Sequence, residues 1–587
     1  MSSNSSELST TPSNYQFRFK PYLFDAGIVL LLALATLFIN WKMIRDGYNG
    51  LGDLLWHITW VQHFYKQLVE GIWYPRWLAG TNFGYGSPTF VFYPPFVYYL
   101  GAVLRVIGLN IEQTITGLFS LALFGSGICF YIYGLNKWGR TSSGRIASSI
   151  GALCYMTVPA IANVIYFGGL AALFAMPFIP LGLYLTDQAL LRPKWGVALA
   201  IFWALMALTH VPSLLIYTIA WIFYTLFFLL KRSWQSVTAT ILSTGIGFGM
   251  VSFYLLPAIL EQSFVNIEVM RKSKGGFQEN LLGSSTLQLF PLHNLERGPY
   301  IFIHQSVAII ILTIIILVCC HKKPAIIQET WRWLALMSVL VFLMSYWSLP
   351  IWQASRTLQM IQFPLRLVGL YSFGGAALAG LAVKGILKLP LRFRILPFLI
   401  IIVIILANLK FAYQLSRAYP ALHNPGRGKV ENIERLKIAL YAPYTDKLID
   451  VPEYRPLLKN HHSSPPVPVI GQTPVSVVSG KAAIQINQWN SYNRKFQLTV
   501  EESSIIRVRT YYYPAWHLYV NKKNHSIDVS DDGTMELKLE SGSYEVELRY
   551  QWTRYLTVGV VLSLFSILAL VLFWLKSPKT SISLSDG

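Results

Sequence analysis

Long apolar runs, separated by short polar connections, occupy most of the 587-residue chain. A membrane-spanning helix needs roughly 20 predominantly apolar residues, the length that crosses the hydrocarbon core of a bilayer. We predict a spanning helix over each run that meets or approaches that length: 22–41, 113–134, 147–164, 168–187, 196–210, 212–230, 236–257, 301–320, 331–349, 366–386, 395–413 and 554–575. The pattern therefore predicts a polytopic α-helical membrane protein with about 12 transmembrane helices.

Residues 414–553 break this pattern between the last two predicted spans. Residues 414–480 are Pro-rich and weakly patterned, whereas short runs from about residue 481 alternate apolar and polar positions, as in KAAIQIN and YEVELRY. Seven such runs, separated by turn signals such as Asp531-Asp532-Gly533, indicate antiparallel strands. We predict an extracytoplasmic domain over 414–553, with a β-sandwich from about residue 481.

Composition and charge agree with a membrane protein. Hydrophobic residues make up 54% of the chain and charged residues 13%, against about 25% charged residues in ordinary soluble domains. Such a chain cannot cover a water-soluble surface of this size. The net charge of +21 is concentrated in short connections between alternate spans, which is typical of cytoplasmic loops. This placement excludes a nucleic-acid-binding surface and predicts a multi-pass cell-membrane protein with both termini in the cytoplasm.

This topology divides the chain into five parts. They are a cytoplasmic tail (1–21), a transmembrane domain (22–413) with outer loops 42–112 and 258–300, the outer domain (414–553), a final span (554–575) and a second cytoplasmic tail (576–587). The apolar segment 91–108 does not fit as a full span, because counting it would place the later basic loops outside. We predict a re-entrant or interfacial segment there, beginning irregularly at Tyr93-Pro94-Pro95. Arg271, Lys272 and Lys274 remain as a basic patch in the outer loop 258–300.

The first outer loop contains the most informative polar residues. Asp53 and His57 are four residues apart, so a helix would place them on one face. A carboxylate at the membrane surface can accept a proton from a hydroxyl group. Asp53 follows Gly52 at the start of the helical pattern and could instead be an N-terminal cap. Asp46 is the competing acid, and His57 could be an interfacial histidine that serves packing alone.

Other candidate residues lie at the outer ends of predicted spans. His210 follows Thr209 in a polar break between two spans, where polar groups are costly and often functional. Gln362 lies just before a late span and Arg366 begins that span, and Arg366 could bind a phosphate or extend toward lipid headgroups. Glu261 is a possible second acid. The outer domain has no recognisable acid pair or nucleophile arrangement, and its aromatic residues Tyr511, Tyr512 and Trp516 could pack or stack on carbohydrate.

Several motifs give the chain a family resemblance. After the Asp53/His57 pair come G-x-x-Y-P-x-W (Gly71 to Trp77), G-Y-G-x-P (Gly84 to Pro88), F-Y-P-P (Phe92 to Pro95) and Q-F-P-x-R (Gln362 to Arg366). Nearly the whole chain resembles the GT-C superfamily of integral-membrane glycosyltransferases. Within it, the chain is most similar to the bacterial membrane proteins described as 6-pyruvoyl-tetrahydropterin synthase-related and to the neighbouring YfhO-like group.

The resemblance implies a GT-C-like fold and an enzyme. GT-C enzymes transfer a hexose or pentose from a polyprenyl-phosphate carrier to a glycan, lipid or protein acceptor on the outer face of the membrane. By this resemblance Asp53 and His57 are catalytic, and the substrate-binding residues are His210, Gln362, Arg366 and Glu261. The acid would act as a base or through a divalent cation, and the sequence identifies no metal ligands. The alternative is a non-catalytic membrane protein that binds or moves a lipid-linked glycan or cell-envelope polymer.

Overall fold

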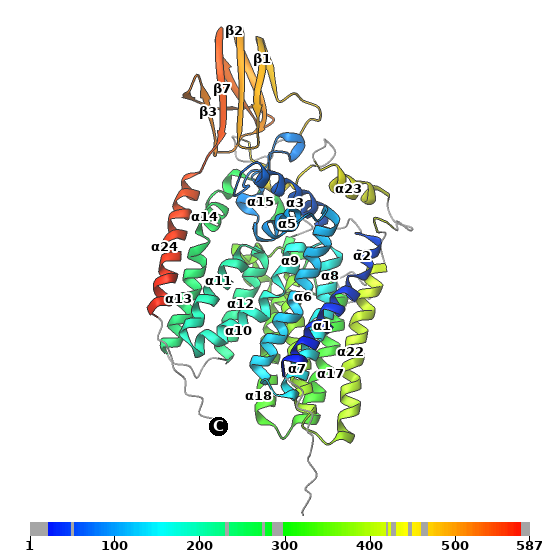
Figure 1. The fold of residues 1–587 in the computed structure, drawn as a ribbon. Coiled ribbons are helices and arrows are strands. Elements are labelled where there is room, and N and C mark those ends of the chain that lie inside the picture. Colours follow the sequence, from blue (N-terminus) through cyan, green and yellow to red (C-terminus); the bar gives the residue numbers. More distant parts are fainter. Residues whose placement is uncertain are drawn as a thin grey trace, which may run out of the picture.

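The computed structural model describes residues 21–48, 52–228, 234–272, 276–284, 298–417, 421–423, 430–443, 449–458 and 468–576. A bundle of long helices carries a β-sheet at one end, and the last helix descends from the sheet along the side of the bundle (Figure 1). We call the two ends of the bundle the sheet end and the opposite end. The predicted class, a helical membrane protein with a C-terminal antiparallel sheet, is confirmed.

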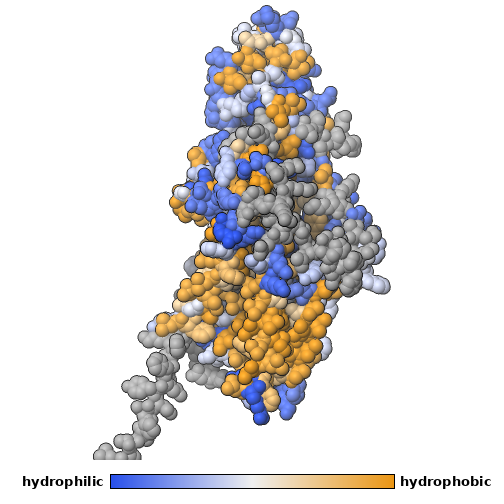
Figure 2. Space-filling model, turned by 90° about the vertical axis from the view of Figure 1, so that its right-hand side faces the viewer, coloured by the Kyte–Doolittle hydropathy of each residue, from blue (hydrophilic) through white to orange (hydrophobic). Residues whose placement is uncertain are grey.

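Within these described residues, nine helical segments are long and apolar enough to cross a membrane. They are α1 (Pro21–Ile39), α6 (Ile111–Trp138), α7 with α8 (Ser142–Thr157 and Pro159–Tyr166), α9 with α10 (Leu170–Ala175 and Phe178–Leu191), α17 (Gly298–Cys320), α18 (Pro324–Met344), α21 with the short turn η6 before it (Val368–Ile386 and Pro364–Leu367), α22 (Leu391–Arg417) and α24 (Arg554–Lys576). Each coincides with a predicted apolar run, although α18 begins earlier than predicted. Figure 2 shows apolar side chains as a large orange region over the bundle on the face turned to the viewer.

Three of the twelve predicted spans take a different form. Helices α13 (Trp234–Met250) and α14 (Ser252–Leu260) form one broken segment with a bend of 70°. Helices α11 (Gly196–Ala207) and α12 (Val211–Phe228) are shorter apolar helices. At about 1.5 Å per residue, the 12 residues of α11 extend only roughly 18 Å, less than the bilayer core. For these three segments, an apolar run in the sequence therefore predicts burial but does not establish that the helix crosses the whole bilayer.

Helix α21 lies at the centre of the bundle. Nearly all of its side chains are buried, and its sequence is rich in glycine and alanine. A Cβ atom added at Gly380 would lie 2.1 Å from the Trp138 ring, so only glycine lets α6 approach α21 this closely. Small residues at helix contacts are the usual means of close packing in membranes.

The basic connections gather at the opposite end. The turns α6–α7, α17–α18 and α21–α22 all lie there (Figure 1). Lys384 donates a hydrogen bond to the carbonyl of Trp138, and Lys323 donates to that of Gly385 at 2.8 Å. Lysine side chains thus bind the last carbonyls of neighbouring helices, which carry partial negative charge. This common location agrees with the predicted alternation of loops, and the orientation in the cell remains a prediction.

The described strands form one antiparallel sheet. They are β1 (Val475–Trp489), β2 (Asn493–Tyr511), β3 (Trp516–Val520), β4 (Lys523–His525), β5 (Asp528–Val529), β6 (Thr534–Leu539) and β7 (Gly542–Tyr550). The 19-residue strand β2 joins two predicted strands, pairs with β1 along one edge, and pairs on the other edge first with β7 and then with β6. Seven strands are described, but β2 combines two predicted strands and β4 was not predicted. The strands share one hydrogen-bonded sheet that divides at β2 and do not form two separate sheets.

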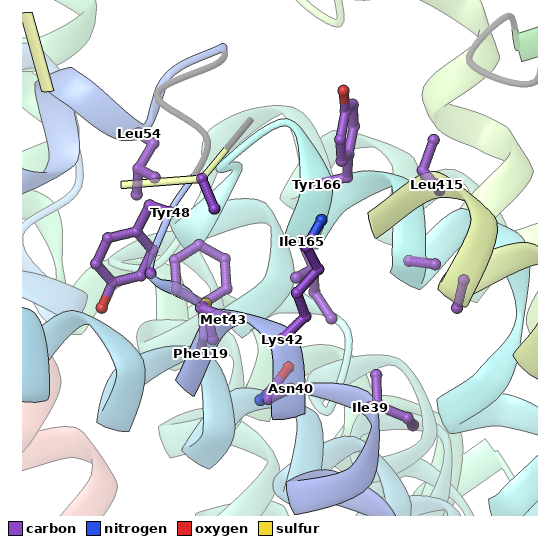
Figure 3. Close-up of a pocket in the computed structure, with 14 residues that line it drawn as sticks. Ile39, Asn40, Lys42, Met43, Tyr48, Leu54, Phe119, Ile165, Tyr166 and Leu415 are labelled. Atoms are coloured by element: carbon purple, nitrogen blue, oxygen red, sulfur yellow. The ribbon is translucent and has the colours of Figure 1, made fainter. Parts of the chain in front are cut away.

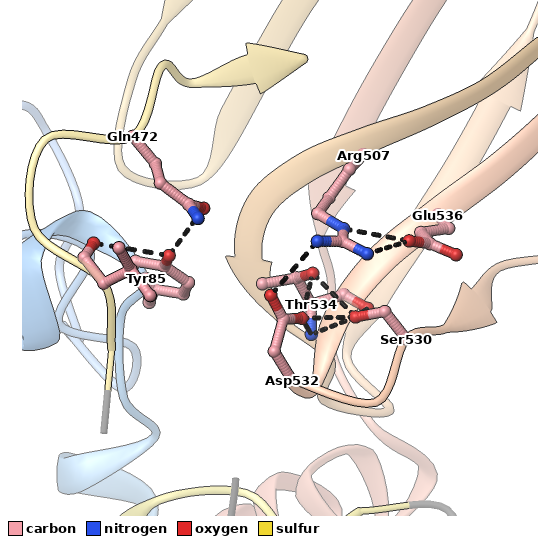
Figure 4. Close-up of polar contacts among 8 residues, drawn as sticks. Tyr85, Gln472, Arg507, Ser530, Asp532, Thr534 and Glu536 are labelled. Atoms are coloured by element: carbon pink, nitrogen blue, oxygen red, sulfur yellow. Dashed lines mark hydrogen bonds and ion pairs between the residues drawn. The ribbon is translucent and has the colours of Figure 1, made fainter. Parts of the chain in front are cut away.

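The sheet rests on the first outer loop. The hydroxyl of Tyr85 donates to Gln472 Oε1 at 2.7 Å, and the Tyr511 N–H donates to the Tyr85 carbonyl at 2.9 Å (Figure 4). Trp516 and Tyr511 are almost fully buried. They therefore pack within the sheet and against this loop. This agrees with the packing alternative for Tyr511 and Trp516 and not with stacking on carbohydrate.

The acidic turn Asp531-Asp532-Gly533 connects β5 and β6, as predicted for a hairpin. Asp532 accepts hydrogen bonds from Ser530 and Thr534, and Arg507 pairs with both Asp532 and Glu536 (Figure 4). Asp532 and Glu536 are therefore engaged by partners within the sheet.

The first outer loop itself forms a helical layer at the sheet end. It contains α2 (Trp41–Asp46), α3 (Leu54–Val69), α4 (Thr89–Phe92) and α5 (Phe96–Val106). Helix α5 packs on α3 beside the start of α6 (Figure 1). The segment 91–108 is therefore a break followed by an 11-residue helix at the sheet end, in agreement with an interfacial segment.

Candidate active site

Asp53 precedes the first residue of α3, and the backbone around it is tightly packed. Its N–H donates to the carbonyl of Phe167 at 3.2 Å. Gly52 has a φ of 59°, and a Cβ atom there would lie 2.1 Å from the same carbonyl oxygen. Gly168 faces it, with no room for a Cβ atom beside Leu54. The two glycines let the turn between α8 and α9 hold the start of α3 firmly.

The Asp53 side chain is exposed and makes no capping hydrogen bond. Asp53 therefore occupies the cap position without the bond that gives a cap its stabilising effect. A fixed backbone and an exposed carboxylate are the properties expected of an acid that meets a ligand.

His57 lies one turn further along α3 and is buried. Its Nδ1 shares a 2.7 Å hydrogen bond with the Tyr98 hydroxyl, and its ring meets the edges of Trp60 and Tyr93. Burial lowers the pKa of His57 to about 4, against a smaller opposing effect of Asp53. The imidazole is therefore neutral at pH 7, so His57 can position neighbouring groups and exchange a hydrogen bond but does not supply a positive charge.

Gln362 and Arg366 approach the same region from the turn before α21. Gln362 has a φ of 67°, which is unusual for a residue other than glycine. Its amide donates to the Met270 carbonyl at 3.0 Å, and its Oε1 accepts from Arg366 at 3.4 Å. Arg366 also donates to the Ile361 carbonyl at 2.7 Å. These bonds hold the guanidinium in one orientation.

The turn between α11 and α12 brings His210 to this cluster. The Phe96 N–H donates to the Leu208 carbonyl at 2.9 Å, which places this turn against the start of α5. His210 Nδ1 shares a 2.7 Å hydrogen bond with the Ser213 hydroxyl. The charge of Arg366 acts on His210 and on Tyr93, and Asp53 acts on Arg366. Residues far apart in sequence, Asp53, His57, His210 and Arg366, therefore lie within electrostatic range of one another.

A second acid, Glu453, joins this cluster from the segment 449–458. It belongs to the short turn η7 (Pro452–Tyr454), and Tyr454 stacks on Phe92 with ring centroids 6.0 Å apart. Burial, with the neighbouring Asp450 and Asp53 carboxylates, raises the pKa of Glu453 to about 7. Sequence reasoning missed Glu453, because it lies in a Pro-rich stretch without periodicity and only folding brings it to Asp53.

Asp450 fixes this segment on the first outer loop. It is buried, and its Oδ1 accepts from Trp60 Nε1 at 2.9 Å while its Oδ2 accepts from the Thr89 hydroxyl at 3.0 Å. Its own N–H donates to Asn82 Oδ1 at 3.1 Å. Burial raises the pKa of Asp450, and these hydrogen bonds oppose that effect. Asp450 therefore has a positioning role for Glu453.

The raised pKa of Glu453 predicts a pH-dependent stability. The folded protein binds the Glu453 proton more tightly than the unfolded chain, so this contribution is present at low pH and is lost as pH rises through 7. His57 and His63, whose pKa values burial lowers to about 4, change stability in the opposite direction. We therefore expect Glu453→Gln to gain roughly 1 kcal/mol over the parent protein between pH 6 and pH 8.

Thermal unfolding of both proteins in detergent measures this difference. His57→Phe serves as a control, because it should change the pH dependence with the opposite sign. A difference between Glu453→Gln and the parent that stays constant from pH 6 to pH 8 would contradict the assignment.

Two other predicted residues have partners away from this cluster. Both carboxylate oxygens of Glu261 are engaged, one by the Tyr513 hydroxyl at 2.5 Å and the other by the Thr553 hydroxyl. Glu261 thus joins α14 to the sheet and to the start of α24. Asp46 forms a two-point ion pair with Arg45, which lowers its pKa. Through these contacts, Glu261 and Asp46 have structural roles in the outer layer.

The basic patch of loop 258–300 is only partly described. Arg271 and Lys272 end α15 (Ile267–Lys272), but the description does not extend to their side chains, and Lys274 lies outside the described residues. Among the described residues, no three His, Cys, Asp or Glu side chains come together in a metal-binding arrangement. Asp53 and Glu453 are the acids that could hold a divalent cation at this site.

Comparison with known proteins identifies a family. A sequence model described as the 6-pyruvoyl-tetrahydropterin synthase related domain, a membrane protein, matches residues 90–416, more than half of the chain. No curated protein matches the sequence.

Among solved structures, the apo oligosaccharyltransferase of Archaeoglobus fulgidus shares 12% identity at a TM-score of 0.47 over 74% of this chain and 62% of that chain, so the match spans less than two thirds of its length. The arabinofuranosyltransferase AftD from Mycobacteria shares 14% identity at a TM-score of 0.42, over 68% of this chain and 27% of that chain. ArnT from Cupriavidus metallidurans, bound to undecaprenyl phosphate, shares 13% identity at a TM-score of 0.35, over 72% and 75% of the two chains.

Because these structural likenesses are distant, they leave the chemistry to be argued from the residues of this chain. The family match covers the segment from the F-Y-P-P motif through the Q-F-P-x-R motif to the end of α22. The chain belongs to the family of 6-pyruvoyl-tetrahydropterin synthase-related membrane proteins.

Proposed function

We propose that this protein is a GT-C-type membrane glycosyltransferase. It would transfer a hexose or pentose from a polyprenyl-phosphate donor to an acceptor at the sheet end, which faces outward from a bacterial plasma membrane with both termini in the cytoplasm. The observation that carries the proposal is the meeting of an exposed carboxylate, Asp53, with the Arg366 guanidinium and the second acid Glu453 at the sheet end of a membrane bundle.

This arrangement supplies the two functions that glycosyl transfer from a lipid phosphate requires. Asp53 accepts the proton of the acceptor hydroxyl as its oxygen bonds to the anomeric carbon of the sugar. The bond from that carbon to the phosphate oxygen breaks, and the released phosphate gains negative charge. Arg366 stabilises this charge with a guanidinium that is already oriented. Glu453, with a pKa of about 7, can take up the proton from Asp53 at neutral pH.

The remaining polar residues of the cluster hold these groups in place. Gln362 fixes both Arg366 and α15. His57 and His210 are buried, and each shares a side-chain hydrogen bond, with Tyr98 and with Ser213 respectively. Such support matters because an error of about 1 Å in a reacting group can cost roughly a hundredfold in rate.

The direct test is transfer by the purified full-length chain in lipid nanodiscs. A panel of radiolabelled polyprenyl-phosphate hexoses and pentoses is supplied with a membrane-lipid extract as acceptor, and label is followed out of the donor fraction. Transfer from at least one donor is expected. Hydrolysis alone, or no loss of label from any donor, counts against the proposal.

We expect Arg366→Gln to weaken use of the donor. Loss of a charged hydrogen-bond donor to phosphate costs about 1.5–3 kcal/mol, or roughly 10- to 100-fold in kcat/KM for the donor. Arg356 lies shortly before Arg366 in the sequence and is exposed. Arg356→Gln is therefore the matched control and should leave kcat/KM unchanged. Equal values for both variants would remove Arg366 from the donor site.

The non-catalytic alternative predicts a different pattern. A protein that only binds or moves a lipid-linked glycan would not release polyprenyl phosphate from any donor. Its glycan binding would survive in the double variant Asp53→Asn with Arg366→Gln, whereas the proposed enzyme should lose both donor binding and transfer.

A further inference from the structure

A groove lies beside the start of α3. Its walls come from α1, α2, α6, α8 and α22, and it encloses about 690 Å³ including its open mouth. Apolar side chains such as Ile39, Phe119, Ile165 and Leu415 form most of the lining (Figure 3). An apolar lining with a few placed polar groups is typical of ligand sites.

The helices that bound the groove face lipid. Spans α1 and α22 are among the least buried of the bundle, and Phe38, Trp41 and Tyr413 near the groove level are each more than half exposed. Exposed aromatic residues of this kind are typical of the boundary between the membrane and water. The groove therefore lies beside surfaces that are suited to contact lipid.

The polar groups of the groove favour a particular headgroup. Asn40 is only 1% exposed, and within the described part of the chain no donor contacts its Oδ1, although its amide group bonds Ser120. A buried acceptor without a donor is costly and points to a missing hydroxyl or amide partner. The Lys42 side chain extends into the groove toward Tyr166 (Figure 3). Its ammonium group suits an anionic group such as a phosphate.

The groove also adjoins the proposed active site. Leu54 lines the groove and is the residue next to Asp53 on the chain. The lining does not include Arg366, Gln362, His210 or Tyr93. The groove is therefore distinct from the cluster around Arg366, and it reaches the position next to Asp53 in the chain.

We propose that this groove binds the hydrocarbon chain of a lipid with a phosphate-bearing head, and that this lipid is the acceptor of the transfer reaction. The acceptor part rests on the proposed function, whereas lipid binding does not. The chain lies along Ile39, Ile165 and Leu415, the phosphate meets Lys42, and a headgroup hydroxyl donates to Asn40 Oδ1. A second hydroxyl of the same head reaches Asp53.

The test uses the full-length chain in nanodiscs of dioleoylphosphatidylcholine. The probe is lysophosphatidic acid with a diazirine in its acyl chain, and cross-linked peptides are mapped by mass spectrometry after illumination. Labelling should concentrate on α6, α8 and α22 at the groove. Unlabelled lysophosphatidic acid should displace the probe better than lysophosphatidylcholine, and Lys42→Met should abolish that difference.

Filling the groove provides the matched comparison. Ala412 lines the groove, so Ala412→Trp should reduce groove labelling by about tenfold or more, a change that corresponds to roughly 1.4 kcal/mol. Leu406 lies on the same helix and is 56% exposed to lipid, so Leu406→Trp should leave labelling unchanged. Ala162→Phe, which fills the groove from α8, replaces Ala412→Trp if that variant does not accumulate.

The outcomes separate the two proposals. Equal labelling of the groove and of the lipid-facing side of α24 would mean bulk lipid only and overturn the site. Groove labelling without sugar transfer would keep the lipid site and overturn the proposed function. Unchanged transfer to lipid by Ala412→Trp, despite lost labelling, would overturn the acceptor assignment alone.

Discussion

Asp53→Asn is expected to abolish sugar transfer while leaving the protein folded. The substitution keeps the size of the side chain but removes the proton-accepting carboxylate, and general-base catalysis contributes about 10²- to 10⁴-fold to rate. The Asp53 side chain makes no capping hydrogen bond, so the helix start should lose little. Transfer measured at saturating donor should therefore show a lower kcat with a nearly unchanged KM, the pattern of a group that acts in the transition state.

Asp46→Asn is the matched control for this prediction. Asp46 is the competing acid considered in the first outer loop, and its carboxylate is paired with Arg45 outside the proposed site. Transfer by this variant should stay within about twofold of the parent, because a partly exposed ion pair contributes little. If Asp53 and Glu453 lie on one proton path, Asp53→Asn with Glu453→Gln should be no slower than Asp53→Asn alone. Full transfer by Asp53→Asn would end the assignment of the base.

The largest expected effect on stability comes from Asp450→Ala. The substitution leaves three buried donors without their acceptor, namely the Trp60 indole, the Thr89 hydroxyl and the Val451 N–H. A buried donor without a partner costs about 1–3 kcal/mol, so the total should reach roughly 3 kcal/mol or more. Because Asp450 joins the segment 449–458 to the first outer loop, Glu453 should also leave its place beside Asp53.

Thermal unfolding and transfer are the two measurements for Asp450→Ala. We expect a lower unfolding temperature together with a loss of transfer. Asp450→Asn keeps one acceptor oxygen and removes the cost of burying a carboxyl, so it should be milder. Asp531→Ala removes an exposed aspartate and should change stability by less than about 0.5 kcal/mol. An Asp450→Ala protein as stable as Asp531→Ala would show that the segment is held by other contacts.

The span pattern was predictable because a lipid environment imposes it. The bilayer core requires long apolar helices whose backbone groups are paired internally, so runs such as 366–386 and 554–575 coincide with α21 and α24. The family was predictable from the motifs of the first outer loop and Gln362 to Arg366, and the match over 90–416 confirms it. Whether an apolar run of 12 to 18 residues, such as α11 or α12, crosses the membrane depends on its neighbours, which periodicity does not report.

The strand pattern was predictable in part. Alternation identified the sheet, since inward and outward positions follow a period of two. Two of the predicted strands form the single strand β2, because β1 pairs along both halves of it. The partners of each strand, and hence the single divided sheet, follow from hydrogen bonds between residues that are distant in the chain.

Composition and periodicity by themselves determined that this is a helical membrane protein with a C-terminal antiparallel sheet, because burial in lipid and strand alternation act on neighbouring residues. They also indicated Asp53, His57, His210, Gln362 and Arg366 as separate candidates. Only the tertiary structure placed Asp53, His57, His210 and Arg366 within electrostatic range, added Glu453 and engaged Glu261 elsewhere. The physical reason is that charge acts through space, and the distances between these residues are set by packing across α3, α11, α21 and the segment 449–458.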